Sequence, residues 1–317
     1  MEKHSSVPVV YAMLNPFDSF QTVRVHKMFA INSKTDWTTL PVDSLTYRDV
    51  DVNISGKNGN QIKWTETLEK SLIDRESGFF PAKDYTIYIL DHPLPIKLVD
   101  MFGGYSLGVP DIDSLILEVH VQDLDLTTCA SAPVLQPFRI AVEPGGSSIY
   151  LFGMHPTHAY LPGGGEDCDP RNDFCYRQIG FRVHYKDYYQ DSEADREISW
   201  TTHEGWGLNP SWFELTPERL FNRMKMLIPY REDVVARILD SIDIEIIAPS
   251  KCFSDYWEVK DISGDSNLPP FTNFDNSFGL FYTFKIGRKT GMKLNPQSLD
   301  TLCKSNSYQV MKFKPWS

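Results

Sequence analysis

The sequence lacks any run of about 18 consecutive apolar residues, the length that a helix needs to cross a bilayer. It is also short of basic residues, since 31 Lys and Arg stand against 42 Asp and Glu and leave a net charge of −11. Sequence-independent nucleic-acid binding needs a basic surface, so this balance argues against it and against docking on an anionic membrane through charge. The N-terminal sequence MEKHSSVPVV lacks the apolar core of a signal peptide, which leaves two alternatives: a cytoplasmic protein, and one whose leader has been removed.

Cysteine is scarce as well. Five cysteines in 317 residues are too few, and odd in number, for a fold that depends on disulfides. Cys168 and Cys175 flank a short loop. The sequence leaves open whether they form one local disulfide in an oxidising compartment or remain thiols.

Motifs of several common catalytic sites are missing too. The sequence contains no HExxH zinc motif and no paired CxxC, and the glycine triplet at 163–165 is not followed by the Lys-Ser/Thr of a phosphate-binding loop. Pairs of acidic residues are expected in so acidic a chain and carry no weight for glycosidase chemistry. We therefore predict no catalytic residues. A hydrolase whose site is assembled from distant strands stays open as an alternative.

What the N-terminal part does have is alternation of apolar and polar residues. Within 21–29, Val23 and Val25 alternate with Arg24 and His26, and in 50–54 and 115–122 every second residue is apolar, the pattern of a half-buried strand. The run Gly56-Lys57-Asn58-Gly59 predicts the tight turn of a hairpin. About seven short strands separated by turns, with no helical period, favour an immunoglobulin-like β-sandwich over residues 1–125.

Between 126 and 137 the chain becomes small, polar and proline-containing, and we place a domain boundary there. Residues 138–317 continue the strand patterns and hold one convincing helix. Thr216 is a suitable N-cap for this helix, and Pro229 ends it. The sequence therefore predicts a mainly β protein whose second, β-rich domain carries one helix near 217–228.

The least ordinary run is residues 269–281, PPFTNFDNSFGLF. Four Phe and one Leu lie here among Pro, Asn, Asp and Gly, which favour turns. So apolar a turn is expected to fold back onto a core, with a strand leaving it at 280–286. We expect this loop and strand to be the element around which the C-terminal half is built.

Short segments spread over nearly the whole chain resemble one family. They are, in chain order, Pro8 to Pro16, Ser77 to Phe80, Tyr105 to Leu107, Pro270 to Asn273 and Phe278 to Phe281, the last two being the most specific. In these segments and their spacing the chain is similar to Bacteroidota lipoproteins that carry a domain of unknown function and are commonly encoded beside TonB-dependent outer-membrane receptors. It departs from that pattern at Asp111 to Ser114, where a Thr-rich segment is usual, and it lacks the family's lipidated cysteine and leader.

The resemblance implies a secreted protein of the cell envelope, anchored to the outer membrane by a lipid and facing either the periplasm or the outside. It implies no known catalytic residues. We therefore expect a non-catalytic accessory binding component of an outer-membrane nutrient-uptake system, with a TonB-dependent receptor as its partner. The alternatives are a glycan-binding or adhesion module that uses exposed aromatic residues, and a hydrolase of unknown substrate.

Aromatic residues are the candidates for such binding. Trp206 and Trp212 lie close together in the sequence, not far from Tyr188 and Tyr189. Flat rings beside amides and acids stack on sugars or on an apolar group of a partner. Trp206 stands between two glycines and is the one most expected to be displayed. The alternative is that these rings are core residues or anchor a loop.

One acidic loop is a candidate for metal binding. Asp167, Asp169 and Asp173 lie in a glycine-flanked loop, and oxygen ligands at such spacing suit calcium. The EF-hand pattern is absent, so a solvated acidic loop is the alternative. His155 and His158 could bind zinc, but the proline between them prevents a helix from presenting both on one face, and exposed loop histidines are the alternative. No other cofactor is predicted.

Overall fold

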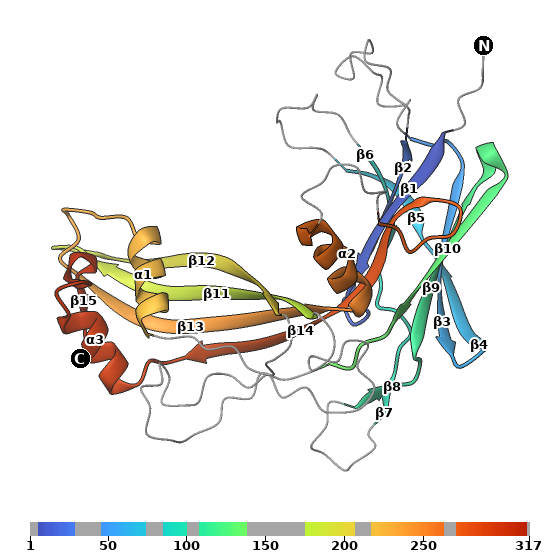
Figure 1. Cartoon of the computed structure of the whole chain (residues 1–317). Coiled ribbons are helices and arrows are strands. Elements are labelled where there is room, and N and C mark those ends of the chain that lie inside the picture. Colours follow the sequence, from blue (N-terminus) through green and yellow to red (C-terminus); the bar gives the residue numbers. More distant parts are fainter. Residues whose placement is uncertain are drawn as a thin grey trace, which may run out of the picture. The chain divides into compact units, whose positions relative to one another are not determined.

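The computed structural model describes residues 6–28, 46–73, 85–99, 108–137, 175–206, 217–262 and 271–315 (Figure 1). In these residues the chain is mainly β, as predicted, with fifteen strands and three α-helices. They fall into two compact units that alternate along the sequence. The described residues up to Gln136 and those of Pro249–Lys285 form the first unit, and those of Asp169–Ala248 and Ile286 onward form the second.

The first unit is built from two sheets. One contains β1 (Val7–Leu14), β2 (Gln21–Met28), β5 (Glu69–Ile73), β6 (Tyr85–Leu90) and the start of β14 (Phe278–Met292), in the order β14-β1-β2-β6-β5. The other contains β3 (Val50–Asn58), β4 (Gln61–Thr67), β9 (Ser114–Val121) and β10 (Leu126–Pro133), in the order β10-β9-β3-β4. The short strands β7 (Leu98–Val99) and β8 (Val109–Pro110) pair with each other.

The inner faces of the two sheets share one core. Val10 and Val23 from the first sheet and Ile54 and Leu117 from the second are all buried in the same cluster. Their neighbours along each strand point the other way, because successive side chains of a strand alternate between the two faces. Two sheets packed face to face form a sandwich. The β-sandwich predicted from the alternation of residues is therefore confirmed.

The strand β14 has a parallel partner in β1. Val10 lies opposite Gly279 and Ala12 opposite Phe281, so residues from opposite ends of the sequence are neighbours in one sheet. The segment Pro249–Lys285, which the sequence prediction assigned to a second domain, clusters with the N-terminal unit. The element expected to organise the C-terminal half thus contributes to the sandwich of the first unit.

The loop before β14 is held in place by its own side chains. Asn273 imitates a strand partner, since its Nδ2 donates to the carbonyl oxygen of Phe281 at 2.6 Å and its Oδ1 accepts from the N–H of Phe281 at 2.9 Å. Phe274 is buried in the sandwich core, as expected of an apolar turn that folds back. Asp275 and Ser277 hydrogen-bond to Thr128 of β10, which ties the loop to the second sheet.

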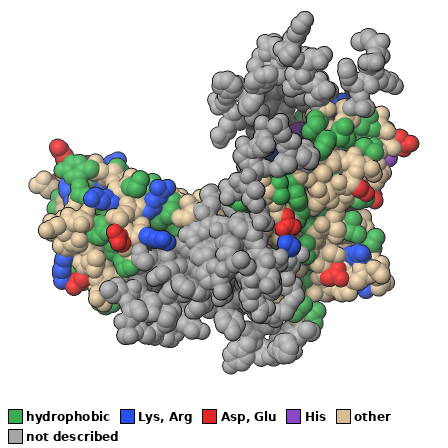
Figure 2. Space-filling view, viewed as in Figure 1, with side chains coloured by type: hydrophobic (Ala, Val, Ile, Leu, Met, Phe, Trp, Pro, Cys, Tyr) green, Lys and Arg blue, Asp and Glu red, His purple; other side chains and the backbone are tan. Residues whose placement is uncertain are grey.

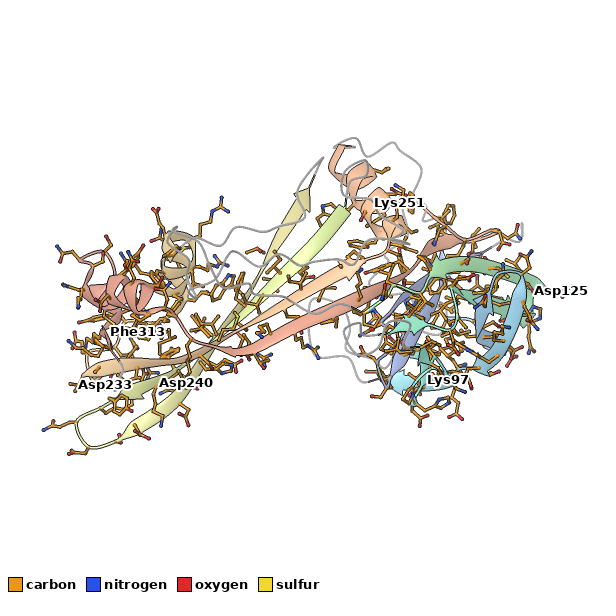
Figure 3. All side chains as sticks on the ribbon, turned by 90° about the horizontal axis from the view of Figure 1, so that it is seen from below. Lys97, Asp125, Asp233, Asp240, Lys251 and Phe313 are labelled. Atoms are coloured by element: carbon orange, nitrogen blue, oxygen red, sulfur yellow. The ribbon has the colours of Figure 1, made fainter. Side chains whose placement is uncertain are left out.

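The second unit contains one long twisted sheet. β11 (Cys175–Tyr188) lies between β12 (Glu193–Trp206) and β13 (Ala236–Pro249) and is antiparallel to both, and β14 follows β13. The two-residue β15 (Phe313–Lys314) pairs with β13 in parallel. Figure 3 shows side chains on both faces of these strands.

One face of this sheet carries the core of the second unit. Phe181 and Val183 of β11 are buried there together with Ile244 of β13. Leu220 of α1 (Pro217–Leu227) and Leu302 of α3 (Pro296–Lys304) cover them. The alternate residues of each strand form the opposite face, which we call the outer face, and these residues are mostly polar or charged.

The prediction of a single helix is corrected. α1 confirms the helix predicted near 217–228, but α2 (Lys251–Ile262) and α3 are also present in the described residues. α3 has a clear start, since Asn295 caps it by accepting a hydrogen bond from the N–H of Ser298 at 2.7 Å, and Pro296 occupies the first turn. α2 is rich in aromatic residues, which have a lower helix propensity than Ala or Leu, so its local helix signal is weak.

Candidate functional site

Aromatic residues from several elements of the first unit gather on the outer side of its β14-β1 edge. We call this cluster the aromatic surface; its members are Tyr11, Met13, Phe253, Tyr256, Trp257, Phe271 and Tyr282. Figure 2 shows hydrophobic side chains, in green, at the surface of this unit.

β1 supplies the most exposed members. Its core face is formed by Val10, Ala12 and Leu14, so Tyr11 and Met13 must point to the other face of the sheet. Their exposed fractions are 53% and 63%. A strand with one solvated face normally carries polar residues there, whereas β1 is apolar on both faces.

α2 supplies the neighbouring rings. Phe253, Tyr256 and Trp257 are three and four residues apart and therefore share one face of the helix. The ring centroid of Phe253 lies 4.6 Å from that of Tyr282 in β14 and 6.0 Å from that of Trp257. The rings thus fasten α2 to the outer side of β14. They are partly buried, so each also leaves some of its surface to solvent.

Contacts between rings extend this arrangement in both directions. The hydroxyl group of Tyr282 donates to the sulfur of Met13 at 3.1 Å, which links the helix-covered strand to β1. On the other side, the ring of Tyr256 meets that of Phe271 edge-on at 6.0 Å. Offset and edge-to-face pairs of this kind add about 0.5–1.5 kcal/mol each beyond the apolar area they bury. The result is a preorganised apolar surface rather than a set of independent side chains.

Two of the described cysteines, Cys129 and Cys303, do not supply a reactive thiol. Burial, together with the charges of Asp275 and Glu118, raises the pKa of the Cys129 thiol. Burial, with the charge of Asp300, also raises the pKa of Cys303. Both side chains are therefore protonated near neutral pH, whereas nucleophilic catalysis needs the thiolate.

A G-x-S-x-G sequence is present at residues 104–108. In a nucleophile elbow this motif forms a sharp turn from a strand into a helix. Here Gly108 is followed directly by the strand β8. Ser106 lies outside the described residues. The motif therefore lacks the helix that a nucleophile elbow requires on its C-terminal side.

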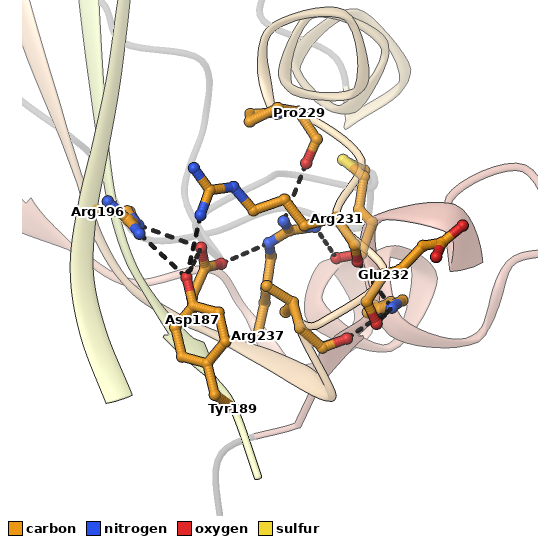
Figure 4. Close-up of polar contacts among 10 residues, drawn as sticks. Asp187, Tyr189, Arg196, Pro229, Arg231, Glu232 and Arg237 are labelled. Carbon is orange, nitrogen blue, oxygen red and sulfur yellow. Dashed lines mark hydrogen bonds and ion pairs between the residues drawn. The ribbon is translucent and has the colours of Figure 1, made fainter. Parts of the chain in front are cut away.

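Two predicted binding residues, Tyr188 and Tyr189, lie where β11 ends. Both side chains are partly buried. The hydroxyl oxygen of Tyr189 accepts from Arg196 at 3.0 Å and from Arg231 at 3.4 Å. The hydroxyl group therefore belongs to a hydrogen-bonded network around Asp187 (Figure 4). A role of these tyrosines in ligand binding stays a prediction.

The other predicted site residues cannot be placed in a site. Trp206 is the last residue of β12, opposite Cys175, and the structure describes its backbone alone. Trp212, His155 and His158, the three aspartates of the acidic loop (Asp167, Asp169 and Asp173) and Cys168 lie outside the described residues. The binding role of the tryptophans, the calcium site and the disulfide all stay predictions.

The described part of the chain contains no group of three or more His, Cys, Asp or Glu side chains placed to hold a metal ion. None of the helices described here is both long and apolar enough to span a bilayer.

The aromatic surface was missed at the level of the sequence, although one signal for it was present. Residues 7–14, VPVVYAML, are apolar on both faces of a strand. Such a run indicates a strand covered on both sides or one that displays apolar groups. The sequence could not show which neighbour covers the second face, since α2 lies more than two hundred residues away in the chain.

No family model, curated protein or solved structure matches this chain. The resemblance carried by its short segments therefore stays a prediction.

Proposed function

We propose that this protein is a non-catalytic binding component of the cell envelope that works with an outer-membrane receptor in nutrient uptake, and that the aromatic surface is where it docks. The observation that carries this proposal is the exposure of Tyr11 and Met13, 53% and 63%, in the middle of a strand and next to a cluster of aromatic rings. Large exposed apolar patches on soluble proteins mark binding sites.

The chemistry of the surface suits a protein partner. Tyr, Trp, Phe and Met are enriched in the buried centres of protein interfaces, and Lys, Glu and Asp are depleted there. Tyr11 and Met13 offer the ring and the flexible thioether that such centres use. Burying the exposed half of a side chain of this size against a partner contributes about 1–2 kcal/mol. Two adjacent anchors are therefore enough to govern a complex of moderate affinity.

The family resemblance supports the kind of partner. Related lipoproteins are commonly encoded beside TonB-dependent receptors, and the segment Phe278 to Phe281, one of the two most specific, lies in the strand that carries Tyr282. The receptor is therefore the partner to test first, and the lipid anchor implied by the resemblance would hold both proteins in the same membrane.

Replacing Tyr11 and Met13 together with threonine is expected to weaken binding to the receptor at least about tenfold, because each interface anchor contributes about 2 kcal/mol. Threonine keeps the strand preference of the site. The measurement is recovery of a TonB-dependent receptor, identified by mass spectrometry, from detergent-solubilised membranes of the source organism by the immobilised full chain and by the variant.

The same unit offers a matched control. Ile62 in β4 and Leu72 in β5 have exposed fractions of 56% and 65% and do not belong to the aromatic surface. Their double threonine variant removes as much exposed apolar surface and should recover the receptor as well as the original chain does. The proposal fails if the original chain recovers no such receptor, or if the two double variants behave alike.

A further inference from the structure

The outer face of the second unit's sheet is hollowed. A cavity of about 630 Å³ lies over β12, β11, β13 and β14, within the range of about 300–1,000 Å³ that is usual for small-molecule sites. It is independent of the aromatic surface, because all the described residues that line it belong to the second unit.

The hollow lies over Gly180, a residue without a side chain. Gly180 lies in the middle of β11 on the outer face, between Thr201 of β12 and Glu245 of β13. Among the described residues, the atoms nearest to a Cβ added at Gly180 lie 3.8 Å away, an ordinary van der Waals contact. Because none of these described neighbours fills the position of the side chain, Gly180 forms the floor of a groove.

Neither backbone conformation nor crowding explains why residue 180 is a glycine. Gly279 has a φ of +127° and no room for a Cβ, and Gly56 is covered by the ring of Trp64 at 2.2 Å from where its Cβ would be. Neither reason applies to Gly180. A glycine in a strand is destabilising relative to alanine, and it often marks a place where a ligand approaches closely. The groove therefore carries a stability cost that the fold itself does not require.

The charged residues that line the groove are balanced, with Arg182 and Arg288 against Asp243 and Glu245. Arg288 contacts Glu245 at 2.6 Å, and Arg182 contacts Glu197 at 3.3 Å across the pair of strands. Nε2 of His184 lies 3.0 Å from Oδ2 of Asp243. An anionic ligand would meet the carboxylates, and a cationic ligand would meet the guanidinium groups. The lining therefore favours neither sign of charge.

Three hydroxyl-bearing residues also line the groove. Ser199, Thr201 and Thr290 contribute side chains that both donate and accept hydrogen bonds. The side chains of three further lining residues, Phe181, Trp200 and Ile244, belong to the core on the opposite face. The lining therefore offers hydrogen-bond donors, acceptors and hydroxyl groups with no net charge. Such a lining suits a ligand whose own groups both donate and accept hydrogen bonds.

We propose that the groove over Gly180 binds a neutral polyhydroxylated ligand of the carbohydrate class. The guanidinium groups of Arg182 and Arg288 donate to ring and hydroxyl oxygens, and the carboxylates of Asp243 and Glu245 accept from sugar hydroxyls. The missing side chain lets a sugar ring lie directly on the sheet. This site differs from the region around Trp206, to which sequence reasoning assigned glycan binding.

The test is isothermal titration calorimetry of the full chain with four neutral probes, maltohexaose, cellohexaose, xylohexaose and mannohexaose, and with hexagalacturonate as an anionic probe. At least one neutral hexasaccharide should bind, and more tightly than hexagalacturonate. The variant Gly180→Val should weaken this binding at least tenfold, because its side chain fills the groove. Valine favours strands and has room here, so the thermal midpoint should stay the same or rise.

Two further variants separate groove filling from general effects. Lys186→Val places the same side chain on the same face of β11, outside the groove, and should bind as the original chain does. Thr201→Val keeps the shape and removes one hydroxyl, so it should weaken binding several-fold. The proposal is overturned if no neutral probe binds, if Gly180→Val binds normally, or if hexagalacturonate binds best. None of these outcomes bears on the receptor experiment, which depends on the other unit.

Discussion

Replacing Gly279 with alanine is expected to lower the free energy of unfolding of the first unit by about 3 kcal/mol. The backbone at Gly279 has a φ of +127°, a region that residues with a side chain rarely adopt. A Cβ atom there would lie 1.8 Å from the carbonyl oxygen of Val10 in β1. That distance is far inside van der Waals contact, so the two strands would have to separate.

Separation of these strands would affect more than one residue. β1 and β14 pair in parallel from Val9↔Phe278 to Leu14↔Thr283, and both contribute side chains to the sandwich core. Asn273, which hydrogen-bonds to Phe281, would lose its fixed partner. The chemical unfolding midpoint, followed by tryptophan fluorescence and by circular dichroism, measures the effect.

Alanine variants at two other glycines distinguish the cost of backbone strain from the cost of crowding. Gly291 has a φ of +68° with nothing within 4 Å of its Cβ position, so Gly291→Ala should cost only the conformational strain, about 1 kcal/mol. Gly180 has neither problem, so Gly180→Ala should leave stability equal or raise it by about 0.5 kcal/mol. A Gly279→Ala variant no less stable than Gly291→Ala would contradict the close approach of β1 and β14.

Replacing Asp187 with alanine is expected to destabilise the second unit by about 3–5 kcal/mol, because it leaves a buried guanidinium group without its counter-charge. The side chains of Asp187 and Arg237 are 3% and 1% exposed, and Nε of Arg237 donates to Oδ1 of Asp187 at 2.7 Å. Figure 4 shows Asp187 between Arg237 and Arg196.

Arg237 also connects segments that are distant in the sequence. Its Nη1 donates to the carbonyl oxygen of Met311 at 2.9 Å and its Nη2 to that of Pro229 at 3.0 Å. One guanidinium group therefore joins β11, β13, the turn after α1 and the C-terminal turn. Arg237→Met should cost a similar amount, and the double variant less than the sum of the two, since it leaves neither charge of the pair unpaired.

An exposed pair of nearly the same length is the control. Lys304 and Asp300 on α3 lie 2.8 Å apart, but their side chains are 68% and 54% exposed. Lys304→Met should cost less than about 0.5 kcal/mol, because solvent screens the pair. Equal losses for Asp187→Ala and Lys304→Met in urea unfolding would contradict the view that burial sets the strength of the Asp187–Arg237 contact.

Local patterns in the sequence predicted the local elements well. Alternation in 115–122 corresponds to β9, and the helical spacing and final proline near 217–228 correspond to α1. The predicted N-cap, Thr216, lies outside the described residues. These features depend on residues a few positions apart, which is the range over which strand and helix periods act. The local signal for α2 is weaker, because aromatic residues have a lower intrinsic helix propensity than Ala or Leu.

Long-range pairing was not predictable in this way. Met13 and Tyr282 contact each other across 269 positions of sequence, and no local pattern specifies such a partner. The grouping of Pro249–Lys285 with the N-terminal unit follows from this pairing. The surroundings of Tyr189 were not predictable either. The sequence marks this residue as a candidate for ligand binding, whereas in the structure its hydroxyl group contacts Arg196 and Arg231.

By itself the sequence determined that this chain is mainly β, acidic, and built with at least one helix, because composition and short-range periodicity decide those properties. Only the tertiary structure decided which faces are covered. It placed Tyr11 and Met13 on an open face beside α2, and among the described residues it left the position of a side chain at Gly180 unfilled. How exposed a side chain is depends on the residues packed around it. In a β protein most of these residues come from distant parts of the chain.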